Sequence, residues 1–295
     1  MKQYLIKSRY ASVFEAGRTP RLFNFYRIYG AHDPDVRCVH VHENALELGI
    51  VIRGFCVSIV DGRSYILKEG DILAVNAGIS HEQNFGLTPD LEYYSIGIKN
   101  LHVHGLRENA LIPEGMHPVL QFPEACREAE TLFKLVSQQL TYADDFAIET
   151  ANHLMLSALS ILLRQIRPFS QGSAAGQPFA AHEHIAQELC HYLDEHYRDD
   201  ISLDNMASAL NLNKYYMTRA FKKAIGYPPI QYLLRRRIGE AQFLLVETGK
   251  TISDIASDVG FKTPGQFSRT FSNILNTTPT RYRKEVLTRY TEETV

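Results

Sequence analysis

The sequence predicts an α+β protein with a β-rich N-terminal part and an all-helical C-terminal third. Two observations lead to this prediction. Residues 22–98 contain short apolar runs separated by turn-forming residues, a pattern typical of antiparallel strands. Residues 201–284 contain one helical pattern twice, offset by 49 residues before an internal turn and by 50 after it. A pattern repeated in this way indicates two equivalent helical units.

The charge of the chain is unevenly distributed. Residues 201–290 hold 14 Lys+Arg and 6 Asp+Glu, whereas residues 1–200 hold 17 and 25. A basic segment beside an acidic remainder indicates a DNA-binding module joined to a part with another role. The 4 cysteines form no CxxC pair, which argues against a disulfide framework or a zinc ribbon. No apolar run is long enough for a signal peptide or a bilayer span, so we expect a cytoplasmic protein without a membrane partner.

The β-rich part contains one clear hairpin. Residues 55–67 alternate apolar and polar side chains around Asp61 and Gly62, and an Asp-Gly pair is a strong signal for a tight hairpin turn. Further strands are expected at 72–75 and 93–98. Many short strands of this kind predict a sandwich or a small barrel.

Two spacings in this part closely resemble the two motifs of the cupin fold. Residues 40–47 read HVHENALE and are followed by six residues and then Gly54. Gly70 is followed by five residues and then the run NAGISH at residues 76–81. The sequence departs from the cupin pattern at Asn76, where a proline is usual, and at Pro34, where a glycine is usual. The resemblance implies a cupin-like barrel with four side chains projecting into it: His40, His42, Glu47 and His81.

These four residues have two interpretations. Residues two apart on a strand share a face, so His40 and His42 can both point inward. In the first interpretation, the four side chains hydrogen-bond an organic effector. We favour this interpretation from the sequence, and it requires no cofactor. Alternatively, three imidazoles and a carboxylate bind a divalent metal such as Zn, Mn, Fe or Ni.

Residues 124–140 and 144–166 show apolar side chains at helical spacing, and residues 168–179 are rich in Gly, Ser, Ala and Gln. The apolar stripe of the second helix, which includes Leu159, either packs on the barrel or forms a dimer interface. We expect the dimer, and a charge at Leu159 would then break it. The Gly- and Ser-rich stretch is expected to be a flexible linker that separates two parts of the chain.

The two C-terminal repeats have the features of helix-turn-helix units. Ser202 and Thr251 are N-cap residues, and Asn211 and Gly260 stand where a tight turn requires a positive φ. A long helix that begins at Pro228-Pro229 joins the units. The second helix of each unit is expected to bury two side chains four residues apart, which are Met217 and Phe221 in the first unit and Phe267 and Phe271 in the second.

On four runs, at residues 207–223, 232–245, 255–271 and 278–283, the chain resembles the AraC/XylS family of bacterial transcription regulators. Ser272-Asn273 replaces the lysines that this family usually keeps. The resemblance implies two recognition helices in successive major-groove segments, a homodimer, and RNA polymerase as a partner. Bases would be read by Tyr215, Thr218, Arg219, Gln266, Ser268 and Arg269, with Thr263 beside them. Phosphates would be held by Lys214, Lys222, Lys223 and Lys262.

The predicted architecture is therefore an N-terminal cupin-like β-barrel, a helical dimerisation segment and an all-α domain with two helix-turn-helix units. The expected bounds are 1–120, 121–167, 168–180 for the linker and 181–290. The expected function is a DNA-binding regulator, an activator in the family's usual mode, that binds a small molecule, with a carbohydrate favoured. The rival interpretation is a metal-dependent cupin enzyme or metal sensor fused to a DNA-binding domain. Nothing else in the sequence indicates a reaction, so we expect no enzyme.

Overall fold

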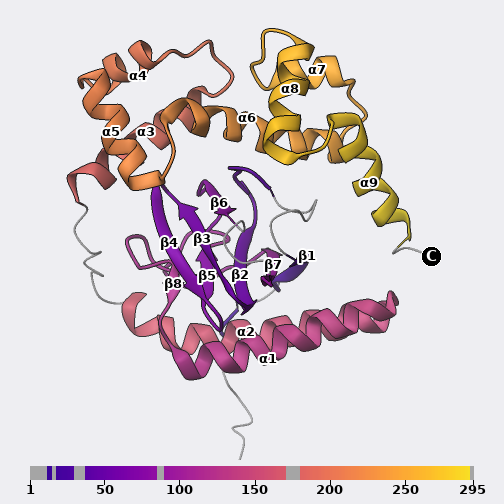
Figure 1. The fold of residues 1–295 in the computed structure, drawn as a ribbon. Coiled ribbons are helices and arrows are strands. Elements are labelled where there is room, and N and C mark those ends of the chain that lie inside the picture. Colours follow the sequence, from indigo (N-terminus) through magenta and orange to yellow (C-terminus); the bar gives the residue numbers. More distant parts are fainter. Residues whose placement is uncertain (1–11, 15–17, 30–36, 85–89, 171–179, 293–295) are drawn as a thin grey trace, which may run out of the picture.

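The computed structural model describes residues 12–14, 18–29, 37–84, 90–170 and 180–292. Strands come first, two long helices follow, and the remaining elements are helical (Figure 1). The strands are β1 (Arg21–Tyr29), β2 (Leu46–Arg53), β3 (Phe55–Val60), β4 (Arg63–Lys68), β5 (Ile72–Val75), β6 (His81–Asn84), β7 (Glu92–Lys99) and β8 (Val119–Leu120). The helices are α1 (Pro123–Gln139), η1 (Leu140–Tyr142), α2 (Asp145–Ser170), α3 (Ala181–His196), α4 (Leu203–Ala209), α5 (Lys214–Ile225), α6 (Pro229–Glu247), α7 (Ile252–Asp258), α8 (Pro264–Leu275) and α9 (Pro279–Glu292).

The strands form two antiparallel sheets, which we call together the sheet module (β1 to β8). One sheet has the order β1-β7-β2-β5-β8 and the other the order β4-β3-β6. A cluster of buried side chains lies between them, with Val51, Leu73 and Tyr93 from the first sheet and Cys56 and Leu67 from the second. The predicted hairpin is confirmed: β3 and β4 pair around Asp61 and Gly62, whose φ angles of 49° and 72° are both positive.

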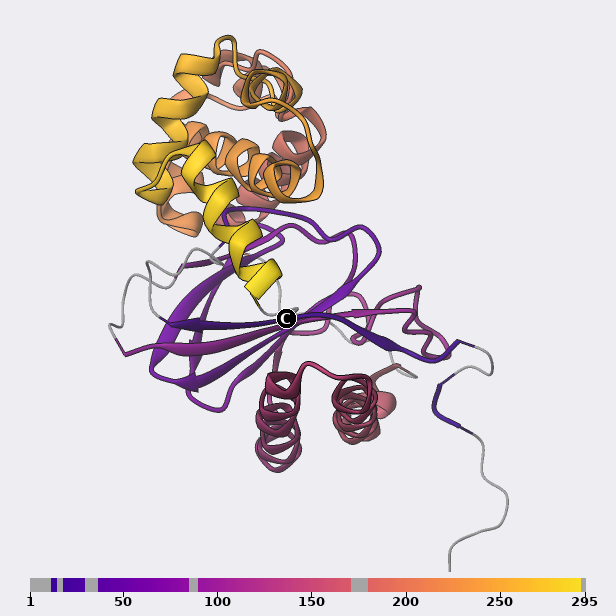
Figure 2. The ribbon, with the colours of Figure 1, turned by 90° about the vertical axis from the view of Figure 1, so that its right-hand side faces the viewer.

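Helices α1 and α2 form an antiparallel hairpin that covers the outer face of the five-stranded sheet (Figure 2). Helix α2 is long and apolar enough to cross a membrane by length and composition alone. Its apolar stripe nevertheless packs inside this chain, because Met155, Leu159 and Leu162 are fully buried against α1 and the sheet. A charge at Leu159 would therefore disrupt the fold of one subunit, so the use of Leu159 as a dimer probe was wrong.

The helical module (α3 to α9) contains the two predicted helix-turn-helix units. Ser202 and Thr251 cap α4 and α7, since their side chains accept hydrogen bonds from Asn205 N and Asp254 N. Asn211 and Gly260 have φ angles of 52° and 86° in the two turns. The inward side chains are also confirmed, and each is fully buried: Met217, Phe221, Phe267 and Phe271.

The helical module lies directly on the sheet module (Figure 1). The expected flexible linker between the two parts stays a prediction, although the two parts themselves are in contact. Residues 168–170 of the expected linker belong to α2, and residues 171–179 lie outside the described residues. The contact is made by α3, α5 and above all α6, the helix that joins the two helix-turn-helix units.

Gly239 allows α6 to lie against the strand segment that carries Cys38, Val39 and His40. A Cβ atom at position 239 would stand 2.1 Å from the Val39 carbonyl oxygen and 3.1 Å from that of Cys38. Both atoms are backbone, so a flexible side chain cannot move aside to make room. The amide of Cys38 also donates to Gln242 Oε1 of α6 at 2.9 Å. The close approach of α6 to this strand segment therefore requires glycine.

We predict that Gly239→Ala destabilises the protein by about 1–3 kcal/mol, the usual cost of inserting a methyl group into a packed contact. Alanine normally stabilises a helix interior by about 1 kcal/mol relative to glycine, so a net loss would identify the clash. Gly249→Ala is the matched control, because nothing lies within 4 Å of a Cβ there. Urea denaturation measures both variants. Equal stability of the two variants would contradict the proposed contact.

Candidate functional site

Four side chains from separate parts of the sheet module meet in one place: His40, His42, Glu47 and His81. His40 and His81 form an isolated antiparallel bridge, in which each amide donates to the other residue's carbonyl at 3.0 Å. Glu47 stands near the start of β2, and His81 is the first residue of β6. Their ligand atoms all lie within 4.8 Å of one another. The structure thus brings together all four residues that the cupin spacing predicts.

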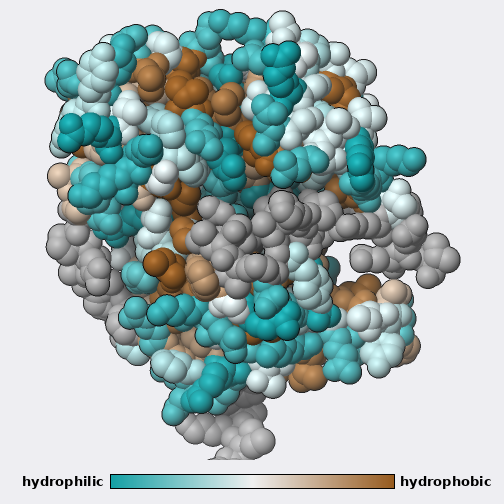
Figure 3. Space-filling model, viewed as in Figure 1, coloured by the Kyte–Doolittle hydropathy of each residue, from teal (hydrophilic) through white to brown (hydrophobic). Residues whose placement is uncertain are grey.

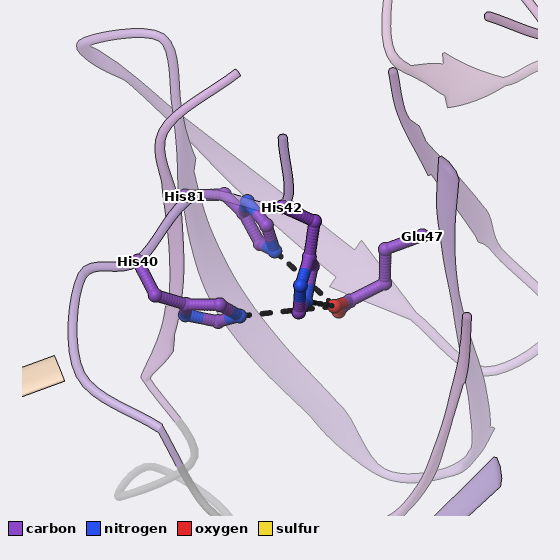
Figure 4. A group of neighbouring side chains, drawn as sticks. All are labelled: His40, His42, Glu47 and His81. Atoms are coloured by element: carbon purple, nitrogen blue, oxygen red, sulfur yellow. Dashed lines mark hydrogen bonds and ion pairs between the residues drawn. The ribbon is translucent and has the colours of Figure 1, made fainter. Parts of the chain in front are cut away.

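The three imidazoles converge on one carboxylate oxygen (Figure 4). Glu47 Oε2 lies 3.0 Å from His42 Nε2, 3.3 Å from His81 Nε2 and 3.8 Å from His40 Nε2. Gln83 Nε2 donates to the other oxygen, Glu47 Oε1, at 3.3 Å. Glu47, His40 and His81 are buried and His42 is half-buried, so this polar group is largely removed from water.

Two of the imidazoles are oriented by the main chain. His40 Nδ1 lies 2.8 Å from the Cys38 carbonyl and His81 Nδ1 lies 2.9 Å from the Ile79 carbonyl. A carbonyl only accepts, so the proton of each ring must be on Nδ1. In the neutral form, Nε2 then presents a lone pair to the centre of the cluster. Metal-binding histidines are commonly held in this way by a backbone carbonyl.

Burial and mutual charge set the protonation of the cluster. Burial, together with the positive charge of His81, lowers the pKa of His40 to about 3. Burial also opposes the charged form of His81, but the nearby Glu47 carboxylate raises the pKa of His81 overall. For Glu47, burial acts to raise the pKa, and the charge of His81 with the three histidine hydrogen bonds holds it well below its usual range. The positive charge of His81 therefore compensates the negative charge of the buried Glu47 carboxylate.

The cavity beside the cluster is small. Its volume is about 20 Å³, and three cluster residues line it together with Tyr26, Ile28, Arg37, Gln83 and Ser95; the three are His40, His42 and Glu47. One water molecule needs about 10–15 Å³ of such volume. The space therefore suits a single ion or water molecule and is far too small for a sugar ring. The donor set, with three imidazole nitrogens and one carboxylate, fits a transition-metal ion.

The residues next to this cluster contact the helical module. Glu82, which follows His81, is bonded to Arg235 of α6 and accepts from Tyr227 Oη at 2.7 Å. Ser80, which precedes His81, accepts from Tyr232 Oη at 3.3 Å. Cys38 and Val39, which precede His40, contact α6 through Gln242 and Gly239. Both histidine-bearing segments of the bridge thus lie directly against α6.

The candidate DNA interface consists of the second helix of each helix-turn-helix unit. Helix α5 begins at an Asn213 cap that accepts from the amides of Tyr215 and Tyr216, and α8 begins at a Thr263 cap that accepts from Gln266 N at 3.2 Å. The residues predicted to contact DNA are exposed or half-buried on these helices or just before α8. They are Lys214, Tyr215, Thr218, Arg219, Lys222, Lys223, Lys262, Thr263, Gln266, Ser268 and Arg269.

Three details of this interface were not predicted from the sequence. Lys214 pairs with Asp204 at 2.6 Å and Lys262 pairs with Asp200 at 2.6 Å, so each of these lysines already has a carboxylate partner. Thr263 serves as the cap of α8. Tyr216 is 51% exposed beside Tyr215, which is 76% exposed, and so belongs to the same surface. The sequence offered one signal for Tyr216, because it stands between the predicted Tyr215 and the inward Met217 of the helical repeat.

Two family models match the chain. The model of the AraC-like ligand binding domain matches residues 23–156, and that of the helix-turn-helix domain matches residues 206–285. Helix α6 lies within the second match and the histidine cluster within the first. Both candidate sites therefore lie in segments that the two models cover.

Several known proteins are similar over most of the chain. The HTH-type transcriptional regulator YdiP of Escherichia coli is 24% identical over 96% of this chain and 92% of its own. The lactose operon transcription activator of Staphylococcus xylosus is 25% identical over 80% of this chain and 82% of its own. Among solved structures, ToxT of Vibrio cholerae O395 covers 90% of this chain and 97% of its own at 14% identity, with a TM-score of 0.42.

The two family models agree with the paired helix-turn-helix units and with a ligand-binding module in the sheet-rich part of the chain. The chain belongs to the AraC family of DNA-binding transcription regulators.

Proposed function

We propose that this regulator reads promoter DNA with α5 and α8 and that the state of the histidine cluster sets how α6 holds these two helices. The observation that supports the proposal most is the direct contact between α6 and the residues flanking His40 and His81. The C-terminal end of α5 contacts β4, where Ser64 Oγ donates to the Ala224 carbonyl. The side chains proposed to read bases on α5 and α8 are exposed or half-buried. They are therefore accessible to a duplex in this arrangement.

The proposed roles follow the exposure of each side chain. Arg219 and Arg269 are exposed one turn into their helices, and arginine is the favoured reader of guanine through two parallel hydrogen bonds. Tyr215, Thr218, Gln266 and Ser268 read neighbouring bases. Lys222 and Lys223 at the end of α5 hold phosphates, together with Lys214 and Lys262 after exchange of their carboxylate partners. Helix α8 lacks a basic pair at its end, so the first unit provides most of the phosphate contacts.

We predict that Arg219→Ala weakens binding to the preferred site by about 1–3 kcal/mol and relaxes the preference at one base pair. Lys222→Ala should instead weaken binding evenly across sequences and reduce the dependence of affinity on salt. A selection from random duplexes, followed by titration at two salt concentrations, measures both. An unchanged site preference for Arg219→Ala would place base reading elsewhere.

We propose that the cluster holds a divalent metal and not an organic molecule. The convergence of three imidazoles on Glu47, the two backbone-held tautomers and the small cavity support the metal. A metal-dependent enzyme would use the same residues, but the relatives with descriptive names are transcription regulators, which favours regulation over catalysis. The proposed reading of promoter DNA also implies a location in the cytoplasm, where that DNA lies.

We predict that Zn²⁺ or Mn²⁺ raises the melting temperature of the metal-free protein by several degrees, and that a chelator reverses the change. Bound metal stabilises only the folded state, by about 2.7 kcal/mol at a concentration 100 times the Kd. Glu47→Gln should abolish the response. Glu43→Gln is the matched control, because Glu43 is exposed in the same loop. A metal-free protein that is indifferent to Zn²⁺, Mn²⁺, Fe²⁺ and Ni²⁺ would contradict the metal site.

The names of two relatives support an activator. One is a lactose operon transcription activator and the other is the transcriptional activator RhaS. We propose by this analogy that the chain activates transcription through RNA polymerase and responds to a carbohydrate. Because the cavity at the cluster excludes a sugar, the carbohydrate must bind elsewhere in the sheet module.

We also propose that the chain forms a homodimer through the corner of the α1–α2 hairpin. This corner projects past the sheets, and hydrophobic side chains interrupt the mainly hydrophilic surface there (Figure 3). Phe146 is 85% exposed, and Tyr142, Ile148 and Leu135 are exposed around it. Exposed apolar side chains at one corner of the molecule favour an interaction surface there.

We predict that Phe146→Lys converts the dimer to a monomer without loss of thermal stability, because Phe146 contributes little to the core of its own subunit. Glu128→Lys, an exposed change on α1, should leave the dimer intact. Light scattering at micromolar concentration distinguishes the states. A wild-type protein that is monomeric under these conditions would rule out the dimer.

A further inference from the structure

A second and much larger cavity lies at the other side of the sheet module. Its volume is about 750 Å³, and it is enclosed by β4, β5, β8, the loop before α1 and one residue of α3, Gln187. A small-molecule pocket typically measures about 300–1,000 Å³. This cavity shares no lining residue with the small cavity at the histidine cluster. It is therefore a separate site with room for an organic ligand.

The lining combines buried apolar residues with exposed polar ones, and we call the exposed part the mouth. Val60, Val75 and Val119 are buried and form the floor. Arg107, Glu114 and Gln121 are exposed at the mouth, and Gln187 of α3 also lines the cavity, with its amide bonded to Asp61. This distribution of amide and carboxylate groups around an apolar base suits a compact molecule that carries many hydroxyl groups, since each hydroxyl both donates and accepts.

Arg107 is the positively charged group at this mouth that is most available to a ligand. Among the residues that the structure describes, none forms an ion pair with its guanidinium, whereas Asp61 is engaged by His191 at 2.6 Å and Arg63 by Glu183 at 3.6 Å. The Arg107 side chain lies over Gly78, with Nη1 3.5 Å from the position of a Cβ there. A planar guanidinium binds a carboxylate through two parallel hydrogen bonds.

An aromatic pair forms one wall. The rings of Tyr65 and His117 meet edge-on with their centroids 5.1 Å apart, and His117 Nδ1 is held by the main chain of Val119. The opposite wall is fixed by Asn76, which accepts from Leu111 N at 2.9 Å and donates to the Ile112 carbonyl at 2.8 Å. The walls are thus formed before any ligand binds.

We propose that this cavity binds an acidic sugar, namely a monosaccharide that carries a carboxylate. Arg107 binds the carboxylate, the polar mouth binds the hydroxyl groups, and the face of Tyr65 and the valine floor contact the apolar side of the molecule. This inference rests on the proposed carbohydrate response and narrows it to a ligand class and a site.

The walls of the cavity also connect it to the helical module. Val60, Asp61, Arg63 and Tyr65 belong to the β3–β4 hairpin, and the tip of this hairpin abuts α3: a Cβ on Gly62 would lie 2.6 Å from Gln187 Cα. Asp61 accepts hydrogen bonds from Gln187 at 2.5 Å and from His191 at 2.6 Å. A sugar that contacts both the hairpin and Gln187 therefore acts on α3 directly.

The test is calorimetric titration of the full chain with galacturonate, glucuronate and gluconate, with glucose and hexanoate as partial analogues. We expect saturable binding of at least one acidic sugar, at least tenfold tighter than glucose or hexanoate. Arg107→Gln should weaken binding tenfold or more, and Arg107→Lys should restore part of it. Arg127→Gln, which removes an exposed arginine of α1, is the matched control and should bind as the wild type does.

Four results would overturn the inference. These are no saturable binding of any of the three acidic sugars, equal affinity for glucose, equal affinity for hexanoate, and unchanged binding by Arg107→Gln. DNA binding of the same samples is measured separately without a ligand. Loss of sequence-specific DNA binding would contradict the proposed DNA reading alone, whereas loss of sugar binding with normal DNA binding would contradict this inference alone.

Discussion

The ion pair between Glu82 and Arg235 is the interaction on which the arrangement of the two modules depends. Glu82 is 1% exposed, and it is bonded to Arg235 and to Tyr227, so its charge is fully compensated only when the helical module is in place. Burial lowers the pKa of Arg235, but the charge of Glu82 raises it above its ordinary value, so this arginine stays charged. Removing one partner of a buried pair typically costs several kcal/mol because the other charge remains buried alone. The docked arrangement is therefore strongly specified.

The position of this pair gives it a regulatory consequence. Glu82 follows His81 directly in the chain, and Arg235 stands on the helix that joins the two helix-turn-helix units. The residue that follows His81 is therefore bonded directly to α6. One turn further along the same face of α6, Gly239 lies against the segment that leads to His40. Helix α6, which joins the two helix-turn-helix units, thus packs against both segments that form the bridge between His40 and His81.

The two cavities reach the helical module by different routes. The small cavity at the cluster lies beside segments that contact α6, whereas the lining of the large cavity includes the β3–β4 hairpin, whose Asp61 is bonded to His191 of α3. Helices α3, α5 and α6 share one buried cluster that includes Leu189, Phe221 and Tyr232. Because this cluster is closely packed, a shift at either route is transmitted to the first helix-turn-helix unit. Allosteric coupling of two ligands requires a shared element of this kind.

The sequence by itself determined the features that depend on local rules. The Asp61-Gly62 turn, the caps at Ser202 and Thr251 and the positive φ of Asn211 and Gly260 all follow from the conformational preferences of single residues. The histidine cluster was also predictable, because two short motifs with fixed spacing encode it. The departure at Asn76 was visible in the sequence, but its role in holding residues 111–112 was not.

Only the tertiary structure decided how the modules meet and how large each cavity is. Arg235 and Glu82 are 153 positions apart in the chain, and Cys38 and Gln242 are 204 apart. No periodicity or spacing rule connects residues so distant, and Gly239 in a helix has no local signature that reveals its partner. The volume of a cavity is likewise set by packing among many side chains. Local preferences fix what each segment becomes, whereas contacts between segments depend on the free energy of the whole packed chain.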